Sequence, residues 1–463
     1  MNWNAFLVGM LPEHFLLAGL VLLIVHAIAL PSGRGMAALA LVVVAAAAAS
    51  ALVLGLTGFQ GEAFPGQLGV DPTVSLGRAL ALALALPVLL LARDDLGDGG
   101  PLYPLLLSSL YGLTLLLGSN SFLTLFLGLE MMSLPVYVLV LLGARRTPSA
   151  EAALKYVILG GAATATLLMG LALLYGSQGR LALDIFARAL AGSDVMAQTG
   201  AILVLLAFFL KGAIVPFHTW APDAYEGASV AVTGYMAAIV KAGVVLAALR
   251  LFGSTASQGV IAQLLVLLPL ASIAWGNLAA MRQPNLRRMM AYSSIAHAGY
   301  LYLAFLGAPA GRFQAVLFYL IAYGVMTLLA FAALPGHRED AERDRLETLA
   351  GLFHRSPYAA VVIGLAMLSL AGIPPLPGFV AKFLIFREVM AAGHTLAAVL
   401  GLVGSYLGIY FYLRVIQYMF MSPLAAASAA ATAPRSRALL ASVLCLVPGF
   451  VVALAPGWVL GAL

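Results

Sequence analysis

The sequence has 463 residues, of which 63% are hydrophobic and 9% are charged, and its formal net charge is +6. This apolar share is far above that of soluble domains, so the sequence predicts an all-α polytopic membrane protein. The small positive charge comes from arginines between apolar segments and does not indicate nucleic-acid binding. The single cysteine, Cys445, excludes an internal disulfide and an iron–sulfur cluster held only by cysteines.

Apolar stretches of about 20 residues predict fourteen membrane segments. They lie approximately at 12–30, 36–56, 74–93, 103–118, 121–143, 152–176, 199–220, 228–252, 260–280, 286–307, 313–334, 357–393, 395–421 and 438–461. The loops are short, which leaves no room for a soluble catalytic domain. The predicted parts are a three-helix segment (1–100), two five-helix units (101–253 and 254–422) and a C-terminal helix (423–463).

Arginines are distributed unequally between the two sets of predicted connections. One set carries Arg34, Arg93, Arg145, Arg146, Arg282, Arg287, Arg288, Arg338, Arg343, Arg345, Arg355, Arg435 and Arg437. The other set carries Arg78, Arg180, Arg188, Arg250 and Arg312. Because basic loops stay in the cytoplasm, the first set is predicted to be cytoplasmic. An even number of spans then places both termini on the outer side.

The predicted segment 199–220 contains a lysine and a signal for a helix break. Ala201 to Leu210 is uninterruptedly apolar, and Lys211 and Pro216 follow. Proline removes a helical hydrogen-bond donor, so we expect the helix to break just past the lysine. Irregular backbone at membrane depth is tolerated only where protein or a wet cavity surrounds it, and a lysine there is costly. The stretch is therefore a candidate functional site.

A second interrupted segment reads SLAGIPPLPGFVAKFLIF over 369–386 and combines Pro374, Pro375 and Pro377 with Lys382. It lies five segments after the first break, and an odd offset inverts the topology of the second unit. Paired broken helices at corresponding positions are the sequence sign of an inverted-repeat transporter. The sequence thus predicts two inverted five-helix repeats, each with one broken helix.

All four lysines lie in apolar segments, whereas the loops use arginine and no lysine as their cationic residue. The lysines are Lys155, Lys211, Lys241 and Lys382. Arginine is effectively always charged, but a desolvated lysine can release its proton. An arginine-rich genome would explain why the loops lack lysine. It does not explain why all four lysines lie in apolar segments. Lys155 has a second interpretation, because Glu151 at i−4 would form a local ion pair with it. For Lys241 the structural alternative is a side chain that extends along the helix until its ammonium reaches the membrane–water interface.

Three further ionisable groups have both a structural and a functional interpretation. Glu130 is either a structural carboxylate or the partner of Lys211. His297 is either a hydrogen-bonded structural histidine or a member of a proton relay, since histidine titrates near neutrality. His218 follows the first break and is a candidate for the cytoplasmic entrance.

Other polar groups are less informative. Arg387, Glu388 and Arg414 form either a polar network or an interfacial group. His14 and His26 share one predicted helix and lie about 18 Å apart, too far to bind one metal ion.

Several stretches resemble one family of membrane proteins. They are LEMMSLPVY (129–137), LKYVILGG (154–161), KGAIVPFHTWAPDAYEGAS (211–229), IVKAGV (239–244), AYSSIAHAGY (291–300) and GIPPLPGFVAKF (372–383). The sequence resembles the antiporter-like membrane subunits of respiratory complex I, which are related to Mrp-type cation/proton antiporters and hydrogenase membrane subunits. The motifs span most of the chain in the family's order. The length and the lysine at position 382 resemble the N-type subunits of NADH–quinone oxidoreductase.

The resemblance implies roles for individual residues. Glu130 and Lys211 would form the coupling ion pair, Lys241 would be the central relay, and Lys382 would lead to the outward exit. His297 would contribute to the central polar axis. Arg387 and Glu388, which follow Lys382, depart from the family pattern.

The resemblance also implies a place for the chain in a larger assembly. The chain would translocate protons in a bacterial inner membrane and bind no cofactor itself. NADH, FMN, iron–sulfur clusters and quinone would belong to partner subunits, and M-type and K/J-type membrane subunits would be its neighbours. Two related alternatives are an Mrp-type sodium/proton antiporter subunit and a hydrogenase-linked membrane subunit. A third is a structural scaffold whose buried charges only specify packing.

Overall fold

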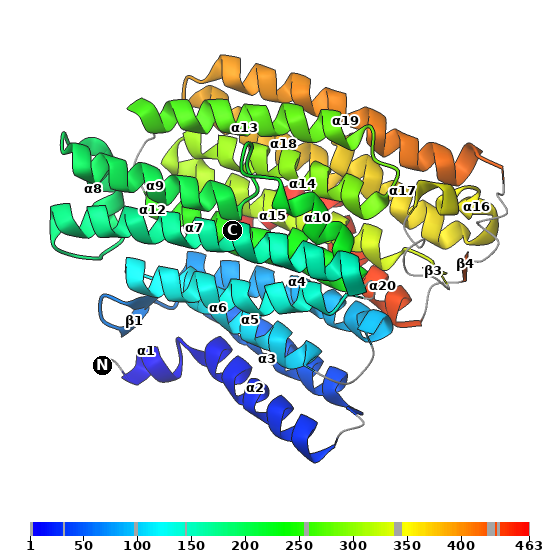
Figure 1. Cartoon of the computed structure of the whole chain (residues 1–463), viewed down its shortest axis with the longest axis horizontal. Helices are drawn as coiled ribbons and strands as arrows, with labels where there is room; N and C mark the ends of the chain where they lie inside the picture. The colour runs from blue at the N-terminus through cyan, green and yellow to red at the C-terminus, as the bar shows by residue number, and fades with distance from the viewer. Residues whose placement is uncertain are drawn as a thin grey trace.

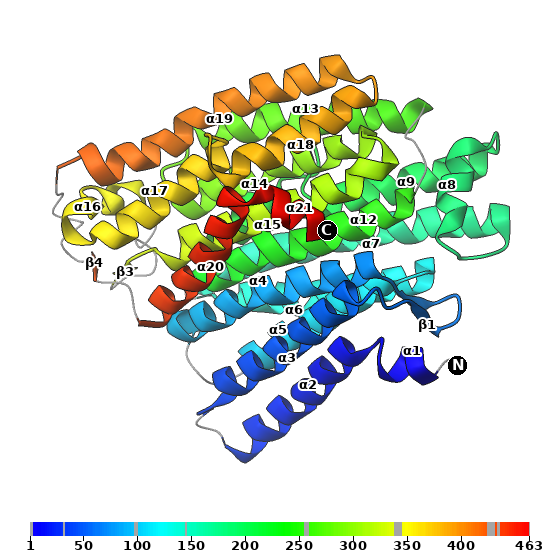
Figure 2. The ribbon, with the colours of Figure 1, turned by 180° about the vertical axis from the view of Figure 1, so that it is seen from behind.

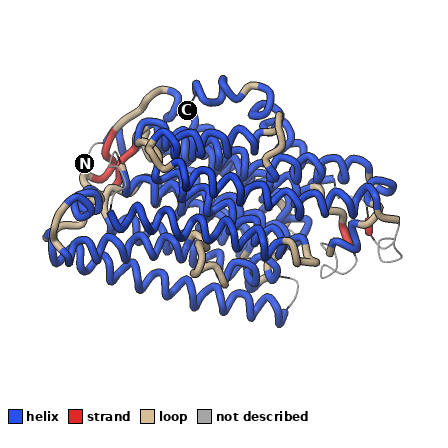
Figure 3. The backbone as a smooth tube through the Cα atoms, turned by 90° about the horizontal axis from the view of Figure 1, so that it is seen from above, coloured by secondary structure: helices blue, strands red, loops and turns tan. Residues whose placement is uncertain are grey.

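A computed structural model describes residues 3–30, 33–96, 101–143, 146–253, 259–337, 345–423, 431–432 and 436–462. Nearly all of these residues are helical, and the long helices run side by side in one bundle (Figures 1 and 2). Viewed from above, many connections lie at the two ends of the helices, and other loop segments lie part-way along the bundle (Figure 3). The predicted class, an all-α polytopic membrane protein, is confirmed.

The first half of the chain builds the lower and middle part of the bundle in Figure 1. Its helices are α1 (Trp3–Leu7), α2 (Leu11–Ala29), α3 (Met36–Leu56), α4 (Pro72–Leu96), α5 (Leu102–Gly118), α6 (Phe122–Leu141), α7 (Arg146–Gln178), α8 (Asp184–Ala191), α9 (Val195–Lys211), α10 (Trp220–Gly227), α11 (Val230–Tyr235) and α12 (Lys241–Phe252). A π-helical turn, η1 (Met236–Val240), joins α11 to α12 without a break.

The second half packs against the first and crosses back over it at the C-terminus (Figure 2). Its helices are α13 (Gly259–Ala280), α14 (Leu286–Leu303), α15 (Pro309–Ala332), α16 (Leu352–Arg355), α17 (Pro357–Ala371), α18 (Pro377–Ala391), α19 (Thr395–Met421), α20 (Ser436–Leu454) and α21 (Pro456–Ala462). Two 3₁₀ turns, η2 (Ala304–Leu306) and η3 (Leu346–Leu349), lie in its connections.

Strands occur only at the ends of the bundle in the part of the chain that the structure describes. The hairpin β1 (Gly61–Phe64) and β2 (Leu68–Val70) lies at the same end as α8 (Figure 1). The two-residue strands β3 (Gly336–His337) and β4 (Ala431–Thr432) pair at the opposite end, beside α16. The sequence analysis did not predict these strands, nor the short helix α8.

Ten helices of the described chain are long and apolar enough to cross a membrane. The continuous helix over 230–252 is completely buried by other helices, and α15 nearly so, which makes these two the centre of the bundle. Helices such as α2 and α7 bury only about a third of their length and expose apolar side chains, as expected for contact with lipid. Each of the fourteen predicted segments coincides with a helix or an interrupted helix, but whether all fourteen cross the membrane stays a prediction.

Two details of the predicted segments are wrong. The last segment is interrupted, because α20 ends at Leu454 and α21 starts at Pro456, where proline cannot continue the hydrogen-bond ladder. Arg78 belongs to no outer connection: it lies within α4 and is fully buried. Its guanidinium pairs with Glu13 of α2 at 2.9 Å and donates to the carbonyl of Thr114 at 3.1 Å. A buried charge requires such partners. Glu13 lies 65 residues before Arg78, so the sequence alone showed no sign of this pair.

Four of the arginines used to predict orientation, Arg145, Arg338, Arg343 and Arg435, lie outside the described residues, as does the side chain of Arg146. Arg250 and Arg312 lie in the last turn of α12 and the first turn of α15. The predicted orientation and the predicted inverted repeats therefore remain predictions.

Candidate functional site

The first helix break lies directly after a buried lysine. Helix α9 ends at Lys211, as predicted, and α10 begins at Trp220 after an irregular stretch that contains Pro216. Side chains from other helices bind the end of α9: the Tyr302 hydroxyl donates to Phe208 O and the Trp220 indole N–H donates to Leu210 O, both at 3.0 Å. The same two carbonyls also accept from the backbone N–H groups of Gly212 and Ala213, so the end of the helix is hydrogen-bonded at the break, as membrane depth requires.

Lys211 and Glu130 form an ion pair at this break, with 3.0 Å between Lys211 Nζ and Glu130 Oε1. The ammonium also donates to Tyr137 Oη at 3.2 Å and to Ser133 Oγ at 3.4 Å. Thr164 donates to the same Glu130 oxygen at 2.6 Å. The Lys211 side chain is 5% exposed and that of Glu130 18%. The pair is therefore largely shielded from solvent, and its lysine sits at the C-terminal, electronegative end of α9.

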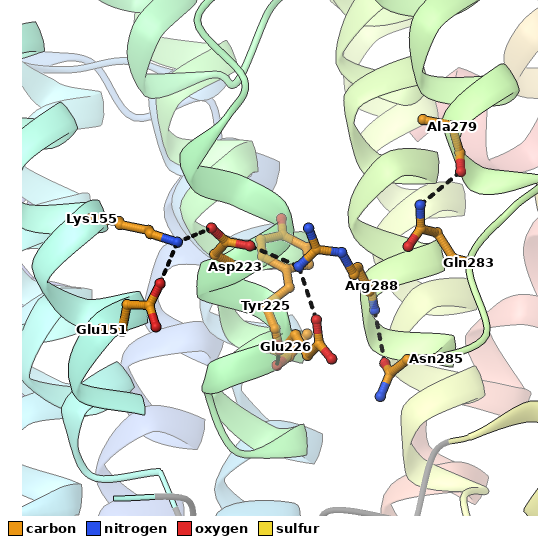
Figure 4. A network of polar contacts seen from close by, with 10 residues as sticks. Glu151, Lys155, Asp223, Tyr225, Glu226, Ala279, Gln283, Asn285 and Arg288 are labelled. Carbon is orange, nitrogen blue, oxygen red and sulfur yellow. Dashed lines mark hydrogen bonds and ion pairs between the residues drawn. The ribbon is translucent and has the colours of Figure 1, made fainter. Parts of the chain in front are cut away.

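Lys155 lies in a different environment, because its side chain is 44% exposed. It pairs with Glu151 at 2.6 Å, which is the predicted local ion pair, and with Asp223 of α10 at 2.7 Å. Asp223 also accepts from Arg288 at 2.7 Å, and Arg288 reaches Glu226 at 2.9 Å (Figure 4). These residues line a cavity of about 280 Å³ at the bundle end that carries the start of α14. Lys155 therefore belongs to a partly exposed network that also fixes α10.

Asp223 is the centre of this exposed network. Burial alone would raise the pKa of its carboxyl, but the hydrogen bonds and positive charges of Lys155 and Arg288 outweigh burial and hold the pKa below its ordinary value. Asp223 is therefore ionised at neutral pH and keeps both cations in place.

Lys241 lies near the centre of the bundle, directly after the π-helical turn η1, and is 7% exposed. Its ammonium donates to the backbone carbonyl of Ser294 in α14. The ring of Tyr323 lies 5.5 Å from Nζ and provides a cation–π contact. Neutral groups thus hold this ammonium, and the alternative of a side chain that reaches the interface is wrong.

His297 of α14 lies in a cluster of tyrosines. Its Nδ1 is 2.7 Å from the hydroxyl of Tyr319, and its Nε2 is 3.0 Å from the hydroxyl of Tyr412. Tyr412 also bonds to Ser293, one turn earlier on α14. His297 is within electrostatic range of both Lys241 and Lys382. It is therefore close enough to both buried lysines to interact with their charges, and each of its ring nitrogens faces a hydroxyl.

Lys382 occupies the second break. Helix α17 ends at Ala371 and α18 begins at Pro377, after Pro374 and Pro375. The Lys382 ammonium donates to the carbonyls of Leu370 and Ala371, each at 3.0 Å, and to Ser405 Oγ at 2.9 Å. The free carbonyls of a half-helix carry partial negative charge. The break therefore creates the binding site for the lysine, and here the lysine follows the break as predicted.

The structure gathers the predicted residues into separate groups. Glu130 and Lys211 form one buried group, and Lys241, His297 and Lys382 line a second along α12, α14 and α18. No hydrogen bond within the described chain joins Lys211 directly to Lys241. His218 is half-buried in the first break, with its ring edge-on to Trp275 at 6.1 Å.

The structure also shows what Arg387, Glu388 and Arg414 contact. Arg387 pairs with Glu388 at 2.8 Å, with the arginine half exposed and the carboxylate nearly buried, so the two form a local pair near the C-terminal end of α18. Arg414 donates to the carbonyls of Met281 and Gln283, just after the end of α13, at 2.8 and 3.3 Å. It therefore binds the backbone that follows this helix.

Four hydroxyl groups of the two sites were not predicted from the sequence, namely those of Ser133, Tyr137, Tyr319 and Tyr412. Ser133 and Tyr137 follow Glu130 at i+3 and i+7, so helical spacing could have placed them on its face. Tyr319 and Tyr323 are also one turn apart in an apolar helix. For Tyr412 the sequence offers no such signal, because its partners lie on another helix.

Comparisons with known proteins agree with this geometry. The family described as "NADH:quinone oxidoreductase/Mrp antiporter, TM" matches residues 119–408, which contain both breaks and all four lysines. NADH-quinone oxidoreductase subunit N of Pelobacter propionicus is 38% identical over 421 residues, covering 90% of this chain and 89% of the relative. Subunit N of Laribacter hongkongensis is 33% identical over 91% of this chain and 89% of the relative.

Solved structures extend the comparison to the fold. A chain of respiratory complex I from Thermus thermophilus superposes with a TM-score of 0.84 at 34% identity, covering 97% of this chain and 98% of that one. A chain of the Mrp complex from Dietzia sp. superposes with a TM-score of 0.85 at 22% identity, covering 100% of this chain and 96% of that one, which establishes the shared fold alone. The chain therefore belongs to the family of membrane subunits shared by NADH:quinone oxidoreductases and Mrp antiporters, and within it groups with subunit N of NADH-quinone oxidoreductase.

Proposed function

We propose that this chain is a proton-translocating membrane subunit of NADH-quinone oxidoreductase without redox chemistry of its own. The observation that carries the proposal is the Glu130–Lys211 ion pair at the end of a broken helix, in a chain that matches subunit N relatives over about nine-tenths of its length. NADH, FMN, iron–sulfur clusters and quinone would then reside in partner subunits. M-type and K/J-type membrane subunits of the same complex would be its neighbours in a bacterial inner membrane.

Glu130 and Lys211 would act as the coupling element. A carboxylate 3.0 Å away favours the charged form of a lysine, and moving the carboxylate away removes that preference. The helix break supports this role, because irregular backbone between α9 and α10 allows the lysine end of α9 to shift with small changes in dihedral angles. A conformational change in the quinone-reducing part of the complex would therefore change the affinity of Lys211 for its proton.

The second group would carry the proton onward. Lys241 and Lys382 are held by carbonyls, a hydroxyl and aromatic rings, none of which carries a formal charge. Either lysine can therefore lose its proton without leaving a buried carboxylate behind. His297 interacts electrostatically with both lysines, and its imidazole can accept on one ring nitrogen while it donates on the other. Outward transfer of each charge works against about 2.3 kcal/mol per 100 mV of membrane potential.

Lys155 and His218 have a different place in the proposal. Lys155 is half exposed and bonded to α10, so it would act at the cytoplasmic entrance by positioning the segment after the break. His218 lies in the break itself, where a titrating imidazole would connect the entrance to Lys211.

The test is to measure proton pumping and quinone-reductase activity together in membrane vesicles from wild type and from Lys211→Ala. The matched control is Arg188→Ala, which removes an exposed cation from α8. The amount of assembled complex is measured in the same preparations. We expect Lys211→Ala to assemble normally and to lose most of both activities, while the control retains them. Wild-type pumping in assembled Lys211→Ala would contradict the proposal and favour a structural scaffold.

An Mrp-type sodium/proton antiporter subunit is the second candidate, because the matched family description covers both kinds of protein. It predicts transport that depends on sodium and needs no quinone. Pumping by the same vesicles in the absence of sodium, driven by NADH, separates the two functions.

A further inference from the structure

A basic cavity of about 290 Å³ opens between α4, α12 and α15, at the bundle end that carries β1 and α8. Arg250 and Arg312 line it, and Asp71 is the one acidic residue among its described lining residues. The lining therefore carries one net positive charge. A cavity of this charge at the end of membrane helices is suited to an anionic group.

Arg250 retains the capacity to bind a ligand. Its guanidinium donates to the carbonyl of Leu117 at 2.7 Å and to Asn120 Oδ1 at 2.9 Å. A guanidinium has five N–H donors, so these two bonds leave others for a further acceptor. The distance from Arg250 Nη1 to Asp71 Oδ2 is 3.9 Å, which is at the limit of an ion pair. Arg312, the second arginine of the lining, is almost completely buried and donates to the carbonyls of Phe305 and Gly253.

An apolar groove of about 450 Å³ is lined by two of the same helices, α4 and α15. On α4 the lining passes from Gly77 in the cavity to Leu76 and onward to Pro87 in the groove, and on α15 it passes from Phe313 to Leu317 and Val325. Helices α3 and α20 form its other walls, and α20 lies beside α15 and α4 in Figure 2.

The length of the groove matches one leaflet of a membrane. From Leu76 to Pro87, the first and last residues of α4 that line the groove, the helix rises about 16 Å. Half of a hydrocarbon core of about 30 Å is about 15 Å. A free phosphate would occupy the basic cavity alone, whereas a molecule with a charged head and an apolar chain fills both compartments.

We propose that α4 and α15 bind one anionic phospholipid, with its phosphate against Arg250 and an acyl chain in the groove between α3, α4, α15 and α20. The excess positive charge of the cavity favours an anionic headgroup over a zwitterionic one, whose own cation would lie near Arg250 and Arg312. The lipid would join the N-terminal helices α3 and α4 to the second unit and to α20. This site is independent of the proposed proton path.

Photo-crosslinking of the intact complex tests the proposal. The complex is reconstituted with phosphatidylglycerol or phosphatidylcholine that carries a diazirine in one acyl chain, irradiated, and digested for mass spectrometry. We expect crosslinks on peptides that contain Ala79–Pro87 or Leu444–Pro448, at least fivefold more with phosphatidylglycerol than with phosphatidylcholine.

Four variants separate the headgroup from the groove. Arg250→Gln should remove the preference for phosphatidylglycerol, and Arg250→Lys should keep it. Ala83→Phe, at an exposed groove position, should reduce crosslinking by both lipids. Arg188→Gln, on the exposed helix α8, is the matched control and should change nothing. If Arg250→Gln fails to assemble, the other two variants test the proposal: Arg250→Lys should keep the lipid preference, and Ala83→Phe should reduce crosslinking. Equal crosslinking by the two lipids in wild type would overturn the proposal and leave only bulk lipid in the groove.

Discussion

The buried lysines are stabilised in two different ways. Lys211 faces a carboxylate, whereas Lys241 and Lys382 face backbone carbonyls and aromatic rings. Removing one partner of a buried ion pair is strongly unfavourable, because it leaves the other charge unpaired. Lys241 and Lys382 have no such constraint. The lysines of the proposed path therefore differ in what they can do. The Lys211–Glu130 pair is suited to sensing a conformational change, whereas Lys241 and Lys382, which have neutral partners, are suited to exchanging protons.

Tyr412→Phe tests whether the hydroxyl on His297 belongs to the proton path. The substitution keeps the aromatic ring but removes the group that links His297 to Ser293. A lost hydrogen bond of about 1 kcal/mol in the rate-limiting transfer lowers the rate about fivefold. We expect proton pumping and quinone reduction to fall together by about this factor, with normal assembly. Tyr410→Phe, at an exposed tyrosine of the same helix, is the control, and equal effects of the two variants would contradict the role.

The sequence was informative where a residue type is costly in a membrane. Lysine and proline in an apolar run are expensive, so Lys211, Pro216 and Lys382 stood out without any structure. Tyr319 and Tyr412 did not stand out, because tyrosine is common in apolar cores and its function here depends on a partner from another helix. The contact between Lys211 and Glu130 was expected from their opposite charges and from the family resemblance, since no pattern in one sequence shows proximity.

Asp223→Asn tests the network at the start of α10 through its pH dependence. Because the folded-state pKa of Asp223 is lowered, the carboxylate contributes stability above its ordinary pKa of about 3.9, and this contribution is lost as the pH falls through the folded-state pKa. The network is partly exposed, so we expect the variant to lose about 1 kcal/mol at pH 7. The difference from wild type should shrink below about pH 4. Thermal unfolding of both proteins at several pH values measures it.

Asp184→Asn is the matched control, because Asp184 pairs with Arg180 and Arg188 on the surface of α8. It should change the unfolding temperature less than Asp223→Asn at pH 7. A difference between wild type and Asp223→Asn that stays constant from pH 7 to below pH 4 would show that the charge of Asp223 does not stabilise α10.

At the scale of elements, the helix breaks are the features that make the site. Each break presents backbone carbonyls at a helix end to side chains of other elements: Tyr302 and Trp220 donate to those of α9, and Lys382 donates to those of α17. The prolines made the breaks predictable, whereas the hairpin β1–β2 and the helix α8 were not predicted. Their residues lie in short polar connections, where packing against the bundle rather than periodicity determines the structure.

The ion pair between Glu13 and Arg78 is predicted to attach α2 to α4. Both side chains are 1% exposed, so removal of one partner leaves a buried charge. We expect Arg78→Met to cost about 3–5 kcal/mol and to make α2 sensitive to protease in the assembled complex. Glu13→Met/Arg78→Met removes both charges and should recover most of the resistance. Limited proteolysis measures the effect, and a double variant no better than the single one would show that the arginine acts through its bond to Thr114.

At the scale of the whole molecule, the polar path lies where the bundle is best protected. The helix over 230–252 and helix α15 are the most buried spans, and they carry Lys241 and the tyrosines Tyr319 and Tyr323. Peripheral helices such as α2 and α7 separate them from lipid. Each predicted repeat contributes one break, and the second buried group forms where the two halves meet, at α12, α14, α15 and α18. This arrangement is what an alternating or relay mechanism requires, since charged groups of both halves then share one interior.

The orientation of the bundle follows from the arginine bias and can be tested with single cysteines. Arg188 in α8 and Glu347 in η3 are well exposed. Turn η3 directly precedes α16, and α8 and α16 lie at opposite ends of the bundle (Figure 1). The native Cys445 is buried and is replaced by alanine in the background. Because the basic set of connections is predicted to be cytoplasmic, a membrane-impermeant maleimide should label Arg188→Cys but not Glu347→Cys in spheroplasts. In inverted vesicles the labelling should exchange. The opposite result would place the Lys155–Asp223 network on the outer side, and the proposed entrance and exit of the proton path would have to be reversed.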